Sequence, residues 1–149
     1  MKVSLALALL LSGAATAQSP GTFTATGNMT VSHAFHTATV LRGKVLITGG
    51  TLLAIGSNGS TLASAELYDP STGTFTTTGS MTTARRLHTA TLLSDGQVLI
   101  AEGNAGLNDS LASAELYDPA TATFTATGNL INGRGWHTAL TEYWKLPSK

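Results

Sequence analysis

The sequence predicts an all-β protein built from copies of one four-stranded unit, and three observations support this prediction. The nonapeptide LASAELYDP occurs at residues 62–70 and again at 111–119. Similarity extends around both copies with a period of about fifty residues, which is longer than one leucine-rich or ankyrin repeat. After the N-terminal segment no stretch shows helical periodicity, whereas alternating Thr-rich stretches recur, as is typical of strands.

Each unit contains four predicted strands, which are clearest in the second copy. The first strand is HTATLL at 88–93, and the turn SDG connects it to QVLIAEG at 97–103. The continuous apolar run VLIA predicts a strand that is covered on both faces. SAELYDP at 113–119 is the third strand and ends at a proline, and FTATG at 124–128 is the fourth. Four antiparallel strands in a unit of this length are typical of a β-propeller blade.

The repeats predict about two complete blades with a single strand on either side. Blade one runs from about residue 32 to 81 and blade two from about 83 to 130. GTFTATGNM at 21–29 matches a fourth strand, and GRGWHTAL at 133–140 begins a further unit with a first strand. Because a closed ring needs four blades or more, we expect an incomplete or oligomer-completed propeller.

Three interpretations of this blade count remain open. The chain is a truncated or frame-shifted piece of a longer propeller, a subunit that closes a ring with other copies, or a short structural subunit that associates edge to edge. Residues 18–140 hold the blades, whereas the tail 141–149 departs from the repeat pattern. An array that stops early leaves strand edges and apolar faces open, which each interpretation has to resolve.

Several motifs carry a family resemblance. The apolar strand that ends in Gly49-Gly50, Tyr68 with Phe75 seven residues later, and the Arg-x-x-His that ends at His88 resemble a Kelch repeat. The AELYDP and TFTATG variants are similar to bacterial exported Kelch proteins of the galactose-oxidase central-domain type. The resemblance implies Kelch-type β-propeller blades. Phe75 stands where Kelch repeats usually have tryptophan, and Glu102 replaces the first glycine of the second diglycine.

The N-terminus predicts an exported protein. Lys2 is followed by the apolar residues 3–11 and by Ala15-Thr16-Ala17, the pattern of a signal peptide over residues 1–17 with cleavage between Ala17 and Gln18. This pattern favours a signal over a buried N-terminal helix, and the apolar run is too short to anchor the chain in a bilayer. We expect the mature chain to be secreted or periplasmic, with no membrane insertion after cleavage.

Composition limits the kinds of partner and the kinds of reaction that we expect of this protein. Only 11% of the residues are charged and the formal net charge is zero, so nucleic acid is not expected as a partner. The absence of cysteine excludes disulfides, thiolate metal sites and a cysteine nucleophile. Galactose-oxidase chemistry depends on a tyrosine that is crosslinked to a cysteine, so the resemblance does not imply that activity here. We expect no enzyme activity and no cofactor.

The titratable residues that recur are predicted to be structural. His36, His88 and His137 share one repeat position, and we expect each to hydrogen-bond a loop backbone near a first strand rather than to bind a metal. Glu66 and Glu115 also recur, and a buried carboxylate needs a partner, so each should meet an arginine or a histidine. We therefore predict neither catalytic residues nor a metal site.

Binding residues are expected on the loops between the second and third strands and between successive blades, which emerge on one face of an antiparallel blade. Amides, a carboxylate and an aromatic ring on that face suit a sugar or a peptide, so we expect a noncatalytic binding or scaffold module for carbohydrate or protein. The alternative is an incomplete piece of a galactose-oxidase-like copper oxidase. The predicted ligand-binding residues are Asn58, Arg86, Asn104, Asn108, Asp109 and Trp136.

Overall fold

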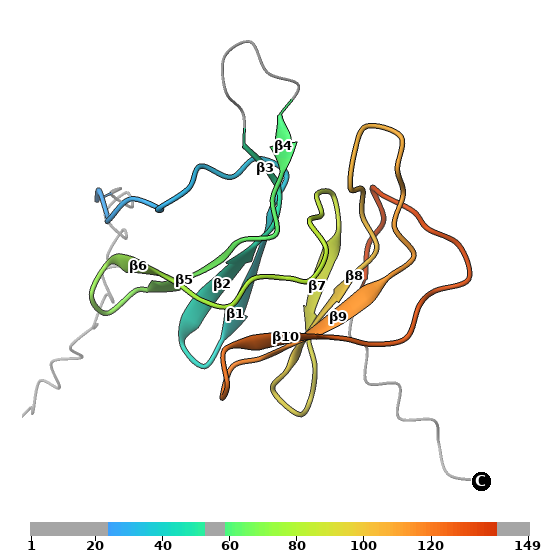
Figure 1. The fold of residues 1–149 in the computed structure, drawn as a ribbon. Helices are drawn as coiled ribbons and strands as arrows, with labels where there is room; N and C mark the ends of the chain where they lie inside the picture. Colours follow the sequence, from blue (N-terminus) through green and yellow to red (C-terminus); the bar gives the residue numbers. More distant parts are fainter. Residues whose placement is uncertain (1–23, 53–58, 140–149) are drawn as a thin grey trace, which may run out of the picture.

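The computed structural model describes residues 24–52 and 59–139, which form strands and no helix (Figure 1). The predicted signal peptide and the tail 141–149 lie outside the described residues. In the described part of the chain, no helix is long and apolar enough to cross a membrane. The four strands of blade one are β1 (Thr37–Leu41), β2 (Lys44–Thr48), β5 (Ala65–Asp69) and β6 (Thr74–Thr77). Those of blade two are β7 (Thr89–Leu92), β8 (Val98–Ala101), β9 (Ala114–Asp118) and β10 (Thr123–Ala126).

Each blade is an antiparallel sheet whose strands follow one another in chain order. The sheets are ordered β1-β2-β5-β6 and β7-β8-β9-β10, which confirms the predicted four-stranded units. Equivalent residues have the same register, because Ile47 pairs with Glu66 in blade one and Ile100 with Glu115 in blade two. The sheets are open and do not form a closed ring, in agreement with incomplete propeller blades.

The connection between β2 and β5 differs from the prediction, which was a Gly-rich loop. β3 (Thr51–Leu52) and β4 (Ser60–Thr61) pair there as a two-stranded antiparallel ribbon. In blade two the same connection contains only an isolated bridge between Asn104 and Ser110. The ribbon and the β8–β9 loop project from the same end of the two sheets (Figure 1).

The predicted tight turns at the other end of the blades are confirmed. Leu41 pairs with Lys44, so two residues connect β1 to β2. Arg42 and Gly43 have φ angles of 48° and 78°, as a hairpin turn requires if it is to match the twist of its strands. The SDG turn closes through a hydrogen bond of 2.8 Å from the Leu93 amide to the Gln97 carbonyl.

The hydrophobic core lies between the two blades. The first strands β1 and β7 are neighbours, and the Thr39 hydroxyl donates to the Ala90 carbonyl at 3.4 Å. Strand alternation directs one set of apolar residues of each blade toward the other blade. The buried cluster that results consists of Leu41, Leu46, Ala65, Met81, Val98, Ile100 and Tyr117.

The segments that flank the two blades are not strands, in contrast to the prediction, because in the described part of the chain neither has a neighbouring strand to pair with along its length. Both nevertheless occupy the positions that the repeat gives them. The Gly27 amide donates to the Gly73 carbonyl at 2.7 Å, as the Gly79 amide donates to that of Ala122 at 3.1 Å. Likewise, the Gly103 amide donates to the Arg134 carbonyl at 2.9 Å.

Gly49 is the glycine that the contact between the blades requires. Its φ angle is 59°, in the left-handed region that favours glycine. A Cβ atom at this position would collide with the Arg85 carbonyl and would lie 2.9 Å from both His88 Cε1 and Met81 Cε. The diglycine therefore allows the segment that enters blade two to lie directly against β2.

Alanine substitutions at Gly43 and Gly49 separate the cost of backbone strain from the cost of a steric clash. Gly43 has a left-handed φ of 78°, but a Cβ atom added there would meet nothing within 4 Å, so Gly43→Ala should lower the free energy of unfolding by about 1–2 kcal/mol. Gly49→Ala should cost clearly more, because it adds a steric clash to the same backbone strain. Urea denaturation of both variants measures the difference, and equal losses would contradict the packing role of Gly49.

Candidate binding face

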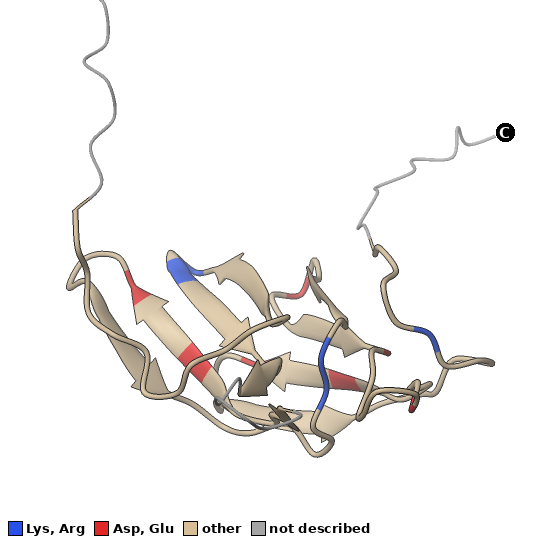
Figure 2. Cartoon of the chain, turned by 90° about the horizontal axis from the view of Figure 1, so that it is seen from above, with Lys and Arg blue, Asp and Glu red and all other residues tan. Residues whose placement is uncertain are grey.

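Charged side chains are sparse in the two blades and several of the acidic ones are buried. Seen from above, acidic positions lie within the strands of both sheets, whereas Lys and Arg are few (Figure 2). Glu66 and Glu115, at equivalent positions on β5 and β9, are both buried. Because a buried carboxylate is costly unless it is paired, the partners of these two residues decide what they do.

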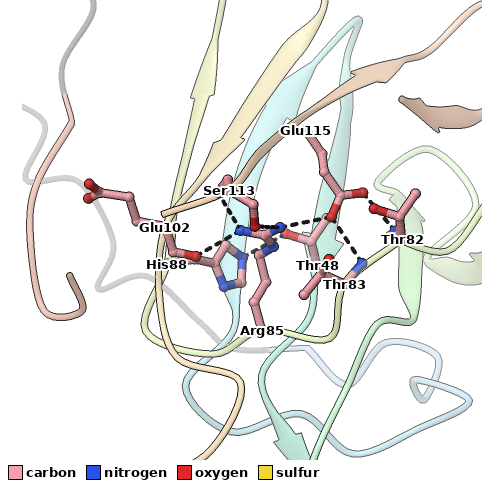
Figure 3. Close-up of polar contacts among 8 residues, drawn as sticks. All are labelled: Thr48, Thr82, Thr83, Arg85, His88, Glu102, Ser113 and Glu115. Carbon is pink, nitrogen blue, oxygen red and sulfur yellow. Dashed lines mark hydrogen bonds and ion pairs between the residues drawn. The ribbon is translucent and has the colours of Figure 1, made fainter. Parts of the chain in front are cut away.

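Glu115 forms a buried ionic network with Arg85 (Figure 3). The Arg85 guanidinium, which is fully buried, donates to a Glu115 carboxylate oxygen at 2.8 Å and to the Glu102 carbonyl at 2.8 Å. The carboxylate also accepts the backbone amides of Thr82 at 2.7 Å and Thr83 at 3.1 Å. These contacts fix the segment that enters blade two, so the network is structural.

Glu66 holds the entry segment of blade one in the same way. It accepts the Thr30 amide at 3.0 Å, the Thr30 hydroxyl at 2.7 Å and the Val31 amide at 3.1 Å. His33 takes the place of Arg85, with Nε2 3.6 Å from the carboxylate. Burial raises the pKa of Glu66, but the hydrogen bonds from Thr30 and Val31 and the nearby His33 outweigh it and lower that pKa. The prediction that both glutamates are paired is confirmed.

His88 connects the blades through side chains, whereas we predicted a contact with loop backbone. Its Nε2 lies 2.9 Å from the Thr37 hydroxyl and 3.1 Å from the Thr48 hydroxyl, both in blade one. The prediction fails here because the imidazole is inserted between the blades, where the hydroxyls of β1 and β2 are its partners. It does hold for His36, whose Nδ1 lies 3.1 Å from the His33 carbonyl oxygen. Burial, followed by the Arg85 charge, lowers the pKa of His88 to about 3.

Glu102 is the one buried acid that departs from the repeat. It has the φ angle of its glycine counterpart, 59° at both positions. Its carboxylate points away from Arg85 (Figure 3). The carboxylate contacts Arg134 Nε at 3.0 Å and His137 Nε2 at 2.9 Å. All three residues line a hollow of about 570 Å³ on the side of blade two that faces away from blade one.

A second set of residues projects from the loop end of the blades. Phe35, Leu87 and Trp136 each precede a repeat histidine, and all three have left-handed φ angles, between 55° and 60°. The Leu87 amide donates to the Phe35 carbonyl at 3.1 Å and the Trp136 amide to that of Leu87 at 3.4 Å. The Phe35 and Trp136 rings meet edge to face with centroids 6.4 Å apart. We call these three residues the apical cluster.

The apical cluster is held in an unfavourable backbone conformation and yet remains accessible. Phe35 is 49% exposed and Trp136 is 79% exposed. A left-handed backbone costs roughly 1–3 kcal/mol for a non-glycine residue, and such residues often occur where a ligand binds. Trp136 was predicted, but Phe35 and Leu87 were not. Their shared position directly before the repeat histidines was the signal that could have identified them.

The structure brings part of the predicted face together. The backbones of Arg86 and Asn104 pair through hydrogen bonds of 3.0 and 2.8 Å, and the Arg86 guanidinium donates to the Gly106 carbonyl at 3.2 Å. The Asn104 side chain lies against Gly135, next to Trp136. The remaining predicted residues are more scattered. Asn108 and Asp109 are exposed on the β8–β9 loop, and Asn58 lies outside the described residues.

The fold and these repeated contacts define two blades of a β-propeller. Residues 32–82 match the Kelch motif, and blade two repeats the same strands and contacts, so the chain carries Kelch-type repeats. Among curated proteins, no sequence matches the chain.

Solved structures show the same fold. A fungal alcohol oxidase of the AA5 family, determined in complex with copper, is similar with a TM-score of 0.59 and 20% sequence identity. The match covers 68% of this chain and 23% of that one. The chain therefore shares its blade fold with this oxidase and spans about a quarter of the oxidase's length.

Removing Arg85 should destabilise the protein strongly. Arg85→Met leaves the Glu115 carboxylate buried without its cation, which typically costs about 3–5 kcal/mol. His33→Met is the matched control, because the imidazole lies 3.6 Å from the Glu66 carboxylate whereas the Arg85 guanidinium lies 2.8 Å from that of Glu115. Chemical denaturation should show a smaller loss in the free energy of unfolding for the control. Equal losses would contradict the prediction that Arg85 stabilises the protein more than His33 does.

The neutral His88 should make the protein less stable in acid. The unfolded chain protonates this imidazole near pH 6.5 but the folded chain only near pH 3, so stability falls as pH decreases between these values. The slope approaches at most about 1.4 kcal/mol per pH unit. The pKa of Glu66 is lowered from 4.5, so its loss of stability begins at a lower pH. Unfolding measured from pH 7 to 5 should therefore show a shallower slope for His88→Gln than for the unmodified protein.

Proposed function

We propose that the chain is an exported, noncatalytic binding module of the Kelch type whose ligand contacts the apical cluster. The observation that carries this proposal is the exposure of Phe35 and Trp136, which flank the half-buried Leu87 at one repeat position in a left-handed backbone. Because the backbone is rigidly hydrogen-bonded, the rings are ordered before a ligand arrives, which reduces the entropic cost of binding.

The chemistry around the apical cluster suits a carbohydrate or a segment of protein. An exposed aromatic ring can cover the apolar face of a sugar or an apolar side chain, and aromatic residues dominate the energy of many binding surfaces. Arg86 and Asn104 add polar groups next to Trp136. Export follows from the signal pattern in residues 1–17, and it places the ligand outside the cytoplasm.

The copper-oxidase alternative has less support in the residues of this chain. The relative named above binds copper, but its sequence identity with this chain supports the fold alone. In the described part of the chain, no group of three or more His, Asp or Glu residues could hold a metal ion, and the sequence contains no cysteine. The described residues do not fit a copper centre.

Fluorescence of Trp136 tests the proposal directly. The chain has two tryptophans, so a Trp144→Phe background leaves Trp136 as the only indole. Titration with a panel of neutral oligosaccharides and, separately, with unstructured peptides should give a saturable change with one of the two classes. Trp136→Ala removes the indole, so its binding is measured by titration calorimetry, and it should be weaker by roughly tenfold or more, as loss of a central aromatic contact causes.

The control for this experiment is Leu92→Ala. Leu92 is also exposed, but it ends β7 next to the tight turn at the opposite end of the blade. Its substitution should leave binding unchanged. The proposal is wrong if neither class of ligand binds, or if Trp136→Ala binds as well as the Leu92→Ala control.

A further inference from the structure

We propose that the chain associates head to tail with further copies of itself, through two open faces that repeat the interface between its own blades. This inference is independent of the proposed ligand-binding function. It concerns the side of blade one that faces away from blade two, here called face A, and the side of blade two that faces away from blade one, called face B.

Face A is a copy of the surface that blade two presents to blade one. Val98 and Tyr117 lie in the buried core between the blades and are 0% exposed. Their repeat counterparts are Val45 and Tyr68, which are identical in type and are only half-buried. Leu46 on β2 faces blade two, so strand alternation directs Val45 to the opposite side, onto face A.

Face B repeats the apolar part of the surface that blade one presents to blade two, with Ala101 and Glu102 in the places of Thr48 and Gly49. Leu99 and Leu130 line the hollow on face B, and they correspond to Leu46 and Met81 in the buried core. Met81 is 4% exposed, whereas Leu130 is 37% exposed. The hollow of about 570 Å³ therefore lies where blade one, at the equivalent place, is covered by blade two.

The polar groups of the two faces are also matched. The Tyr117 hydroxyl bonds the Thr78 hydroxyl across the blades at 2.8 Å. The corresponding groups are Tyr68 on face A and Thr127, which lines the hollow of face B. The exposed His36 likewise corresponds to His88, and the buried Glu102 carboxylate on face B is already paired with a histidine. The tyrosine and threonine hydroxyls of the two faces are thus matched, whereas Ala101 lacks the hydroxyl that Thr48 offers to His88.

Two flanking segments compete for one place in such a junction. Residues 24–33 contact the blade that follows them, through Glu66 and the Gly73 carbonyl. Residues 127–134 contact the blade that precedes them, through the carbonyls of Ala114 and Ala112. The two segments are repeat copies and would fill the same place between two associated chains. One of them is therefore released from its blade, and the one that stays contacts the blades on both sides. The number of hydrogen bonds lost nearly equals the number formed, so the free energy of association comes mainly from burial of apolar surface.

The symmetry of this contact decides what assembly forms. Face A binds face B and not itself, so the interface is heterologous and produces a ring where the rotation closes. At least two copies are needed to reach the four blades of a closed propeller. The pairing of face A with face B excludes an isologous dimer, in which one face binds the same face of its partner.

Two single variants test the head-to-tail arrangement. Val45→Glu places a charge on face A and Leu99→Glu places one on face B. Each variant alone lacks one intact face, so light scattering on a sizing column should show monomers, whereas the unmodified chain forms a larger species. An equal mixture retains one intact junction, between face B of the first variant and face A of the second. It should therefore give a one-to-one dimer that grows no further.

Leu107→Glu is the matched control, because it adds the same charge to an exposed loop leucine that does not line the hollow of face B. This control should associate like the unmodified chain, and recovery of the dimer in the mixture shows that both face variants are folded. The proposal is overturned if the unmodified chain is monomeric at all concentrations. It is also overturned if the face variants associate like the control or if their mixture stays monomeric.

Discussion

The structure depends on a buried glutamate in the third strand of each blade, which binds the segment that enters that blade. The carboxylates of Glu66 and Glu115 accept backbone amides from the residues five and six positions before the repeat histidine. These amides have no strand partner, so the carboxylate takes the role that a neighbouring strand plays elsewhere. The entry segment is thereby fixed, and with it the histidine that is inserted between the blades.

The contact between the blades is formed by residues that belong to the repeat unit. Gly49 allows close approach, His88 bonds the hydroxyls of the preceding blade, and Val98 and Tyr117 supply the apolar area. The repeat supplies His36, Val45 and Tyr68 as the counterparts of His88, Val98 and Tyr117, whereas Glu102 stands in the place of Gly49. The far side of blade one therefore carries the same residue types as the interface, and the far side of blade two departs from it at Ala101 and Glu102.

The sequence was sufficient to predict the strand order, the hairpin turns and the pairing of Glu115, because these depend on local pattern and on the cost of burying a charge. It was not sufficient for the hydroxyl partners of His88 or for the exposure of Phe35. Both depend on how successive repeats are placed against one another, at distances of about one repeat for His88 and about two repeats for Phe35. The ribbon of β3 and β4 was missed because two-residue strands carry too little periodicity to be recognised.

Glu102 shows how a repeat can change without loss of the fold. At Gly49 a side chain is excluded by the segment and the histidine that pack on it, whereas at residue 102 the carboxylate reaches Arg134 and His137 on the open side of blade two. Arg85, the counterpart of Arg134, instead turns into its own blade and binds Glu115. The two repeat arginines are thus both paired with a glutamate, Arg85 with one on its own blade and Arg134 with one on the preceding blade.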